Sequence, residues 1–155
     1  MRDKTPKKLA GLESHLGYWL RQVSNHVSDA FARDLQTRRI SGGEWVALRQ
    51  LYDHEDITSG ELSALLGMTR GAISKILDKL ESKGLVARIT RSEDKRSQAL
   101  ALTLKGKQLL PELAELADMN DAEYFGCLDA EEQAQLRGLL QELAQVHQWH
   151  DVPIN

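Results

Sequence analysis

Residues 58–80 read TSGELSALLGMTRGAISKILDKL, and this stretch decides the fold. Thr58 and Glu61 fit a capping box, in which a hydroxyl and a carboxylate satisfy free amides at the start of a helix, and Ser41 and Glu44 fit a second one at the start of an earlier helix. Gly67 can take the left-handed conformation that ends a helix, and Thr69 is a good N-cap for a second one. The stretch therefore predicts two short helices joined by a tight turn, which is a helix-turn-helix.

The second helix, expected to run to about Lys83, is amphipathic. Its apolar positions recur at helical spacing, and they are Ile73, Ile76, Leu77 and Leu80. With 3.6 residues per turn, the opposite face of the helix carries the other side chains. These are Arg70, Gly71, Ser74, Lys75, Asp78 and Lys79. The N-terminal part of that polar face can enter the major groove of DNA, where an arginine can make two hydrogen bonds to a guanine edge.

The hydrophobic period changes after Gly84. In residues 85–90 and 98–104 the side-chain pattern has the period of two that is typical of a strand, and the polar stretch RSEDKRS at 91–97 separates the two segments. This pattern predicts a hairpin with a charged tip. Arg91, Lys95 and Arg96 at this tip could reach the DNA backbone or a narrow minor groove. Because the hairpin follows the two helices, the order predicts a winged helix-turn-helix.

The other polar residues of the two helices have expected roles of their own. Lys75 and Lys79 are expected to meet phosphates, which position a protein on DNA without specifying sequence. Ser74 could donate a hydrogen bond to a base or a phosphate, and Gly71 with Ala72 leaves room for close approach. A phosphate could also sit at the helix start near Thr58 and Ser59. The candidate DNA contacts from the residues are Thr58, Ser59, Thr69, Arg70, Gly71, Ala72, Ser74, Lys75, Lys79, Arg91, Lys95 and Arg96.

The charge distribution agrees with an anionic partner, although the net charge of −3 does not. Residues 68–107 contain ten basic and four acidic residues, which makes this segment +6 and the remainder −9. A basic segment in an acidic protein can mark a polyanion-binding surface. A chance cluster on a solvated face explains the charge pattern equally well.

The composition is that of an ordinary water-soluble globular protein. The chain has 155 residues, of which 41% are hydrophobic and 28% charged, and this length suits one domain. The single cysteine, Cys127, excludes an internal disulfide. The longest nearly apolar run, 99–104, is too short to cross a membrane, and the N-terminus lacks the apolar core of a secretory signal. We therefore expect a cytoplasmic protein that does not associate with membranes.

Long amphipathic helices are expected on both sides of the central segment. Residues 9–38 predict a helix about 45 Å long, and residues 104–120 and 129–149 predict two more. A small core cannot cover the apolar stripes of these helices, so we expect a homodimer and a palindromic operator with half-sites about 34–36 Å apart. The fold is thus expected to be mainly α with a small β-hairpin wing. Its parts would be an N-terminal dimerisation helix (1–38), the DNA-binding core (39–107) and C-terminal dimerisation helices (108–155).

Residues 41–106 resemble the MarR family of bacterial transcriptional regulators. The matching pieces are EWVAL at 44–48, GELSALLG at 60–67, ISKILDKLE at 73–81, KGLV at 83–86, DKR at 94–96 and LTLKG at 102–106. The resemblance implies that Arg96 contacts the minor groove and that Asp94 braces the wing, which adds Asp94 to the candidate site. It also implies that the terminal helices form a dimer.

Two departures from the family pattern limit what the resemblance implies. The family often has arginine where Lys75 and Lys79 stand, and lysine does not make the bidentate contacts of arginine. Peroxide sensors in the family carry a reactive cysteine in the first helix, whereas Cys127 lies before the last helix in an acidic neighbourhood. Such surroundings disfavour the thiolate, so a thiol switch is not expected.

The resemblance also implies a small anionic or phenolic effector bound between the dimer helices and the DNA-binding core. The candidate residues are His15, Trp19, Trp45 and Arg49. Trp45 could equally be a core residue and Trp19 part of the dimer interface. His147 and His150 share a helix face, as do His15 and His26, but zinc needs three or four ligands. The sequence therefore predicts neither a metal site nor a cofactor.

These observations favour a homodimeric, sequence-specific DNA-binding regulator, most simply a repressor that a small molecule releases from its operator. One alternative is a constitutive or architectural DNA-binding protein without an effector. Another is a helical protein-interaction module whose basic segment is incidental. An enzyme is not expected, because the chain has no Walker-type loop, no HExxH motif and no convincing nucleophile–base pair.

Overall fold

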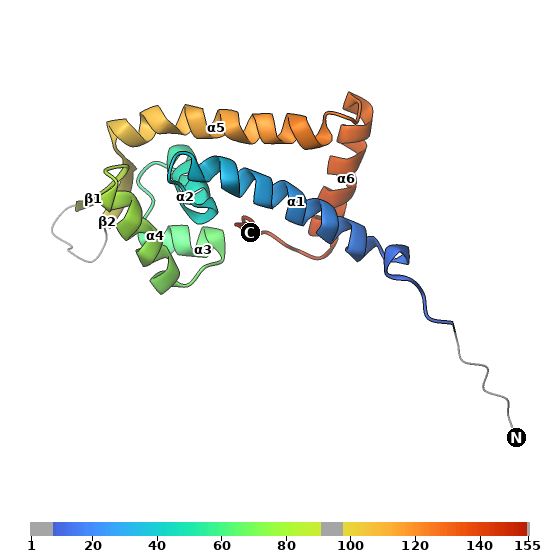
Figure 1. The fold of residues 1–155 in the computed structure, drawn as a ribbon. Coiled ribbons are helices and arrows are strands. Elements are labelled where there is room, and N and C mark those ends of the chain that lie inside the picture. Colours follow the sequence, from blue (N-terminus) through green and yellow to red (C-terminus); the bar gives the residue numbers. More distant parts are fainter. Residues whose placement is uncertain (1–7, 91–97, 155) are drawn as a thin grey trace, which may run out of the picture.

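The computed structural model describes residues 8–90 and 98–154, and these form a mainly helical molecule with one antiparallel hairpin (Figure 1). The elements in chain order are a 3-10 helix η1 (Leu12–Ser14), α1 (Leu16–Gln36), α2 (Gly42–Asp53), α3 (Ser59–Leu66), α4 (Arg70–Ser82), β1 (Val86–Thr90), β2 (Gln98–Leu102), α5 (Leu104–Phe125) and α6 (Ala130–Val146). Their order and types agree with the fold class expected from the sequence.

The turn between α3 and α4 is built as the sequence predicts. The Thr58 hydroxyl accepts from the Glu61 amide, and the Glu61 carboxylate accepts from the Thr58 amide, so the capping box is complete. Gly67 ends α3 in the left-handed region with φ 61°, a conformation that glycine adopts without the penalty of a Cβ atom. The Thr69 hydroxyl then accepts from the Ala72 amide and fixes the start of α4.

The first predicted helix and one expected cap differ from the structure at their starts. The first helix does not start near residue 9: η1 precedes it, and α1 begins after His15, whose backbone is extended and makes no side-chain cap. At the start of α2, Ser41 accepts from the Glu44 amide as expected. The Glu44 carboxylate, however, turns inward to Lys83 at 2.6 Å instead of back to the Ser41 amide. The box predicted there is therefore only half formed.

The core lies where α2, α3, α4 and the hairpin meet the C-terminal end of α1 and the N-terminal half of α5. Nine large side chains are less than 2% exposed, and they are Leu35, Ile40, Leu48, Leu62, Ile73, Leu77, Leu80, Leu100 and Leu113. They come from seven segments of the chain. The apolar stripe of α4 is thus fixed against its neighbours, and its polar face must point outward.

The hairpin is fastened to the start of α3. Its register pairs Val86 with Leu102 and Thr90 with Gln98. The Leu100 amide donates to the Ile57 carbonyl at 2.8 Å, and Thr58 forms an isolated bridge with Ala99. These backbone bonds set the wing beside the N-terminus of α3.

Two long helices, α1 and α5, run side by side, and α6 turns away from the end of α5 (Figure 1). Arg38 pairs with Glu112 at 3.0 Å. Further along the two helices, the side-chain amide of Asn120 donates a hydrogen bond to the Val27 carbonyl. The α5 helix runs past Asn120, where the sequence predicts its end, as far as Phe125. None of the helices in the described part of the chain is long and apolar enough for a membrane span.

Candidate nucleic-acid interface

The α4 helix presents the polar face that its spacing predicts. Arg70, Gly71, Ser74, Lys75 and Lys79 are exposed and Ala72 is half-buried. On the other side of the helix, the stripe residues Ile73, Leu77 and Leu80 are at most 1% exposed. The N-terminal turn is open, since a Cβ atom added at Gly71 would meet no other heavy atom within 4 Å. A duplex can therefore approach the backbone of this turn closely.

A groove of about 400 Å³ lies between the start of α3, the outer face of α4 and the base of the wing. Its lining residues are Thr58, Ser59, Gly60, Arg70, Ser74, Leu77, Arg88, Gln98 and Leu100. The groove therefore brings together Thr58, Ser59, Arg70 and Ser74, which the sequence analysis placed in the interface from separate motifs. Lys75 and Lys79 lie on the same helix but do not line the groove.

Sequence reasoning missed two groove residues, Arg88 and Gln98. The Arg88 guanidinium pairs with Asp78 at 2.9 Å and lies 3.6 Å from Glu81. Arg88 is two residues from the buried Val86, so the period of two places both on the strand face that packs on α4. This period, together with the carboxylates on α4, is the signal that could have identified Arg88. Its ion pairs offset two negative charges next to the proposed DNA-binding face.

The predicted contacts at the wing tip, Arg91, Asp94, Lys95 and Arg96, lie outside the described residues. Thr69, the remaining predicted contact, is exposed and caps α4 with its hydroxyl. Thr69 stands at the N-terminus of α4, where free backbone N–H groups favour an anion.

In the described residues of the single chain, the four effector candidates do not line one common hollow. Trp45 borders a cavity of about 630 Å³ between α1 and α2, where its ring meets Phe31 edge-on at 6.0 Å. His15 borders a hollow on α1, and Arg49 borders one between α2 and α5. Trp19 is 48% exposed and donates from its indole to the Glu13 carbonyl. These four residues therefore stay a prediction that follows from the family resemblance.

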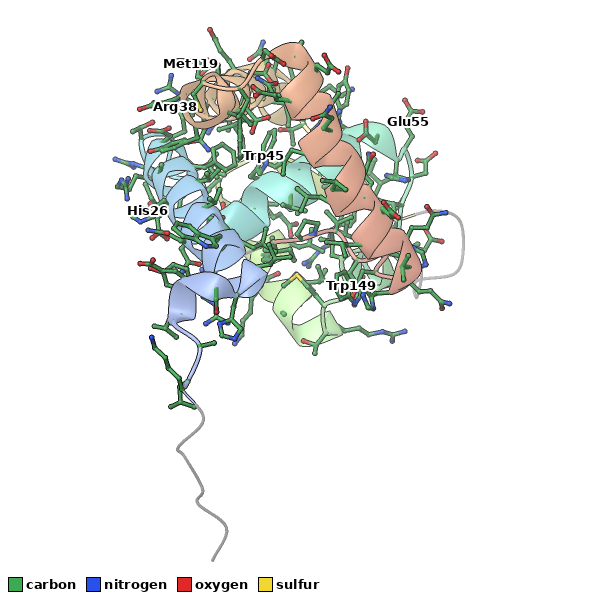
Figure 2. The ribbon with its side chains drawn as sticks, turned by 90° about the vertical axis from the view of Figure 1, so that its right-hand side faces the viewer. His26, Arg38, Trp45, Glu55, Met119 and Trp149 are labelled. Atoms are coloured by element: carbon green, nitrogen blue, oxygen red, sulfur yellow. The ribbon has the colours of Figure 1, made fainter. Side chains whose placement is uncertain are left out.

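In Figure 2, the half-buried Trp45 lies between α1 and α2, His26 stands on α1, and Trp149 lies near the end of α6. The structure describes no group of three or more His, Cys, Asp or Glu side chains in residues 8–90 and 98–154 that could hold a metal ion. The ring of His147 stacks on Trp149 with 4.7 Å between centroids. Cys127 is an exposed free thiol.

Comparison with known proteins finds a matching family model, a curated relative and similar solved structures. Residues 40–98 match the family model described as the MarR family. A curated relative, a putative transcriptional regulatory protein for the hcr operon of Thauera aromatica, is 27% identical over 133 residues, which are 85% of this chain and 80% of the relative.

Two solved structures are similar over most of this chain. A mutant MarR from E. coli, complexed with operator DNA, is 28% identical with a TM-score of 0.73, and the match covers 83% of this chain and 92% of that one. A MarR family protein of Mycobacterium tuberculosis, in complex with salicylic acid, is 29% identical with a TM-score of 0.66 and coverages of 83% and 96%. The match to the family model covers α2, α3, α4 and β1 and ends at the first residue of β2, and the solved structures are similar over the flanking helices as well, so this chain is similar to MarR family transcriptional regulators in sequence and in fold.

Proposed function

We propose that the protein binds double-stranded DNA as a homodimer and represses transcription from a palindromic operator. The observation that carries the proposal is the groove in which the polar face of α4 meets the start of α3 and the base of the wing. The related E. coli MarR, whose structure was solved with operator DNA, supports it.

In this proposal α4 lies in the major groove of the DNA. Arg70, in the first turn, donates two hydrogen bonds to a guanine, and Ser74, one turn further, reaches a base or a phosphate. Thr58 and Ser59 place the free amides of α3 against a phosphate. Lys75 and Lys79 contact the backbone further along. The wing tip, with Arg91, Lys95 and Arg96 braced by Asp94, follows the adjacent minor groove.

Dimerisation accounts for apolar surface that a single chain leaves uncovered. On α6, Leu136, Leu139, Leu140, Leu143 and Val146 are between 37% and 68% exposed. On the N-terminal segment, Leu9, Leu12, Leu16, Leu20 and Val23 are between 47% and 92% exposed. Contiguous apolar patches of this kind mark interaction sites. A twofold axis through these helices places two α4 helices one DNA turn apart, about 34–36 Å.

A small anionic or phenolic effector would release the protein from DNA. The salicylic acid complex of the M. tuberculosis relative supports this ligand class. The cavity between α1 and α2 and the hollow between α2 and α5 both join the DNA-binding core to a dimerisation helix. A ligand that binds better to a state with displaced α4 helices shifts the population away from DNA binding. A constitutive DNA-binding protein would instead keep its operator affinity in the presence of every such ligand.

Selection of bound fragments from random duplex DNA tests the proposal. We expect recovery of a palindrome and a gel shift in which one duplex binds two chains. Salicylate and related aromatic acids are then added to the complex, and release of the DNA is measured. Failure of the purified protein to retain any duplex in low-salt buffer would refute DNA binding and favour a protein-interaction module.

A further inference from the structure

The chain beyond α6 turns back to the DNA-binding core. The helix ends near His147, Gln148 has φ 57°, and the Trp149 amide bonds to the Ala144 carbonyl. Residues 151–154 then run back alongside α2 and α3 (Figure 1). Val152 and Ile154 are half-buried and pack against the core cluster. We call residues 151–154 the C-terminal strap.

Three glycines line the path of the C-terminal strap. A Cβ atom at Gly42 would lie 3.3 Å from the Ile154 carbonyl oxygen, and one at Gly43 would lie 3.7 Å from Ile154 Cγ2. At Gly67 a Cβ atom would lie 2.9 Å from the carboxyl carbon of Asp151. Side chains at Gly42 and Gly67 would press on the strap, whereas one at Gly43 would meet Ile76 first, at 3.1 Å. The strap therefore lies close to the backbone of all three glycines.

The strap contacts α1, α2 and the α3–α4 turn, whose relative positions determine how α4 is presented to DNA. Pro153 and Ile154 close one side of the cavity between α1 and α2, next to Trp45. Asp151 lies on Gly67, two residues before the N-cap Thr69 of α4. The strap therefore connects the end of a proposed dimerisation helix with α1, α2 and the α3–α4 turn.

We propose that the C-terminal strap positions the α3–α4 turn relative to the dimerisation helices and so holds α4 in the arrangement that binds DNA. This inference rests on the DNA-binding function proposed above. Release of the strap lowers the fraction of molecules in the binding-competent arrangement. The apparent dissociation constant then rises in proportion, without a change in the bases that α4 contacts.

A disulfide cross-link tests the position of the strap without DNA. Gly43→Cys and Ile154→Cys are combined with Cys127→Ser and oxidised. We expect a reducible bond within one chain, seen as loss of both free thiols in a species that keeps monomer mobility on a non-reducing gel. The control pair, Gly71→Cys with Ile154→Cys, should stay unlinked, because the Cβ position at Gly71 has no neighbour within 4 Å. An absent bond, or one that joins two chains, would overturn the proposed position.

Hydrogen exchange and operator binding test what the strap does. Truncation before Asp151 should speed amide exchange at residues 67–70 and raise the operator dissociation constant by about five-fold. Ile154→Val keeps most of the contact and should behave like the original chain, and the oxidised Gly43→Cys, Ile154→Cys variant should keep full affinity.

Unchanged exchange and unchanged affinity in the truncated chain would refute the positioning role. If the intact protein binds no duplex, the proposed function fails, while the cross-link and the exchange rates still decide whether the strap holds the turn. A truncated chain that has lost its base preference as well as its affinity would also count against the proposal, because the strap contacts none of the outward residues of α4.

Discussion

Lys83, which follows α4, donates a 2.6 Å hydrogen bond from Nζ to the carboxylate of Glu44, and Glu44 is only 4% exposed. The same ammonium group donates to the Arg39 carbonyl at 2.6 Å, and the Lys83 carbonyl accepts from Lys105 at 2.9 Å. One residue therefore ties the end of the helix proposed to bind DNA to the loop before α2, to the start of α2 and to the start of α5.

Replacement of Lys83 by methionine should destabilise the fold. The change leaves the buried Glu44 carboxylate without its charged partner, and stranding such a group costs about 2 kcal/mol after allowance for the one-third exposure of Lys83. Urea denaturation measures the loss in the free energy of unfolding. Lys79→Met on the exposed face of the same helix serves as the control and should change stability by less than about 0.5 kcal/mol. Equal effects of the two substitutions would contradict a special role for the ion pair.

Gly67→Ala should also lower stability, by about 1–2 kcal/mol, because φ 61° is unfavourable for a residue with a Cβ atom and because that atom would crowd the Asp151 carboxyl group. Thermal unfolding measures this loss. Gly71→Ala is the matched comparison: its added methyl group meets nothing in the protein, so stability should hold or rise by up to about 1 kcal/mol. That methyl group does face the proposed major-groove contact, and DNA binding should weaken. A Gly67→Ala chain as stable as the original would exclude the conformational argument.

The sequence predicts the structure best where short-range signals decide it. Thr58, Gly67 and Thr69 act on residues within a few positions of themselves, and the structure forms these caps and turns as expected. The alternation in residues 85–90 and 98–104 gives the hairpin for the same reason. The outward face of α4 follows from the helical period alone once its apolar stripe is buried.

Long-range contacts explain what sequence reasoning missed. The Glu44 carboxylate accepts a hydrogen bond from Lys83, 39 residues away, instead of from the Ser41 amide. The spacing between Ser41 and Glu44 does not predict this long-range partner. Arg88 belongs to the groove because α4 carries Asp78 opposite the strand. The effector candidates follow from the family resemblance, which gives no distances within this chain, and the fold places Trp45 and Arg49 at different hollows.

Arg70→Ala tests whether the first turn of α4 specifies sequence. Loss of a bidentate contact to guanine should cost about 1–3 kcal/mol of binding free energy and relax preference at one base position. Binding to a panel of single-base operator variants measures both effects. Lys75→Ala, a phosphate contact in the proposal, should instead weaken binding to all variants alike. If Arg70→Ala acts uniformly as well, Arg70 contacts a phosphate and its assignment is wrong.

Arg96→Ala tests the wing tip, whose role here follows from the family resemblance. Removal of one cation should reduce the slope of log affinity against log salt by about one unit for each phosphate that it no longer neutralises. Titrations of the operator at several salt concentrations provide the slope. Arg38→Ala controls for the loss of a positive charge, since Arg38 pairs with Glu112 away from the groove. A slope unchanged by Arg96→Ala would remove the wing tip from the interface.

Leu139→Glu should separate the two subunits. Leu139 is 61% exposed in the single chain and lies on the apolar face of α6 with Leu140 and Leu143. A twofold interface contains each substitution twice, and burial of an unpaired carboxylate is strongly unfavourable. Sedimentation should give the mass of one chain, 17.4 kDa.

A single subunit contacts only one half-site of the palindrome with its α4 helix. Operator affinity should therefore fall when the dimer dissociates. Gln145→Glu adds the same charge on the opposite side of α6 and should remain dimeric. If Leu139→Glu stays dimeric and Gln145→Glu dissociates, the interface lies on the other face of α6, and the apolar stripe must have a different partner.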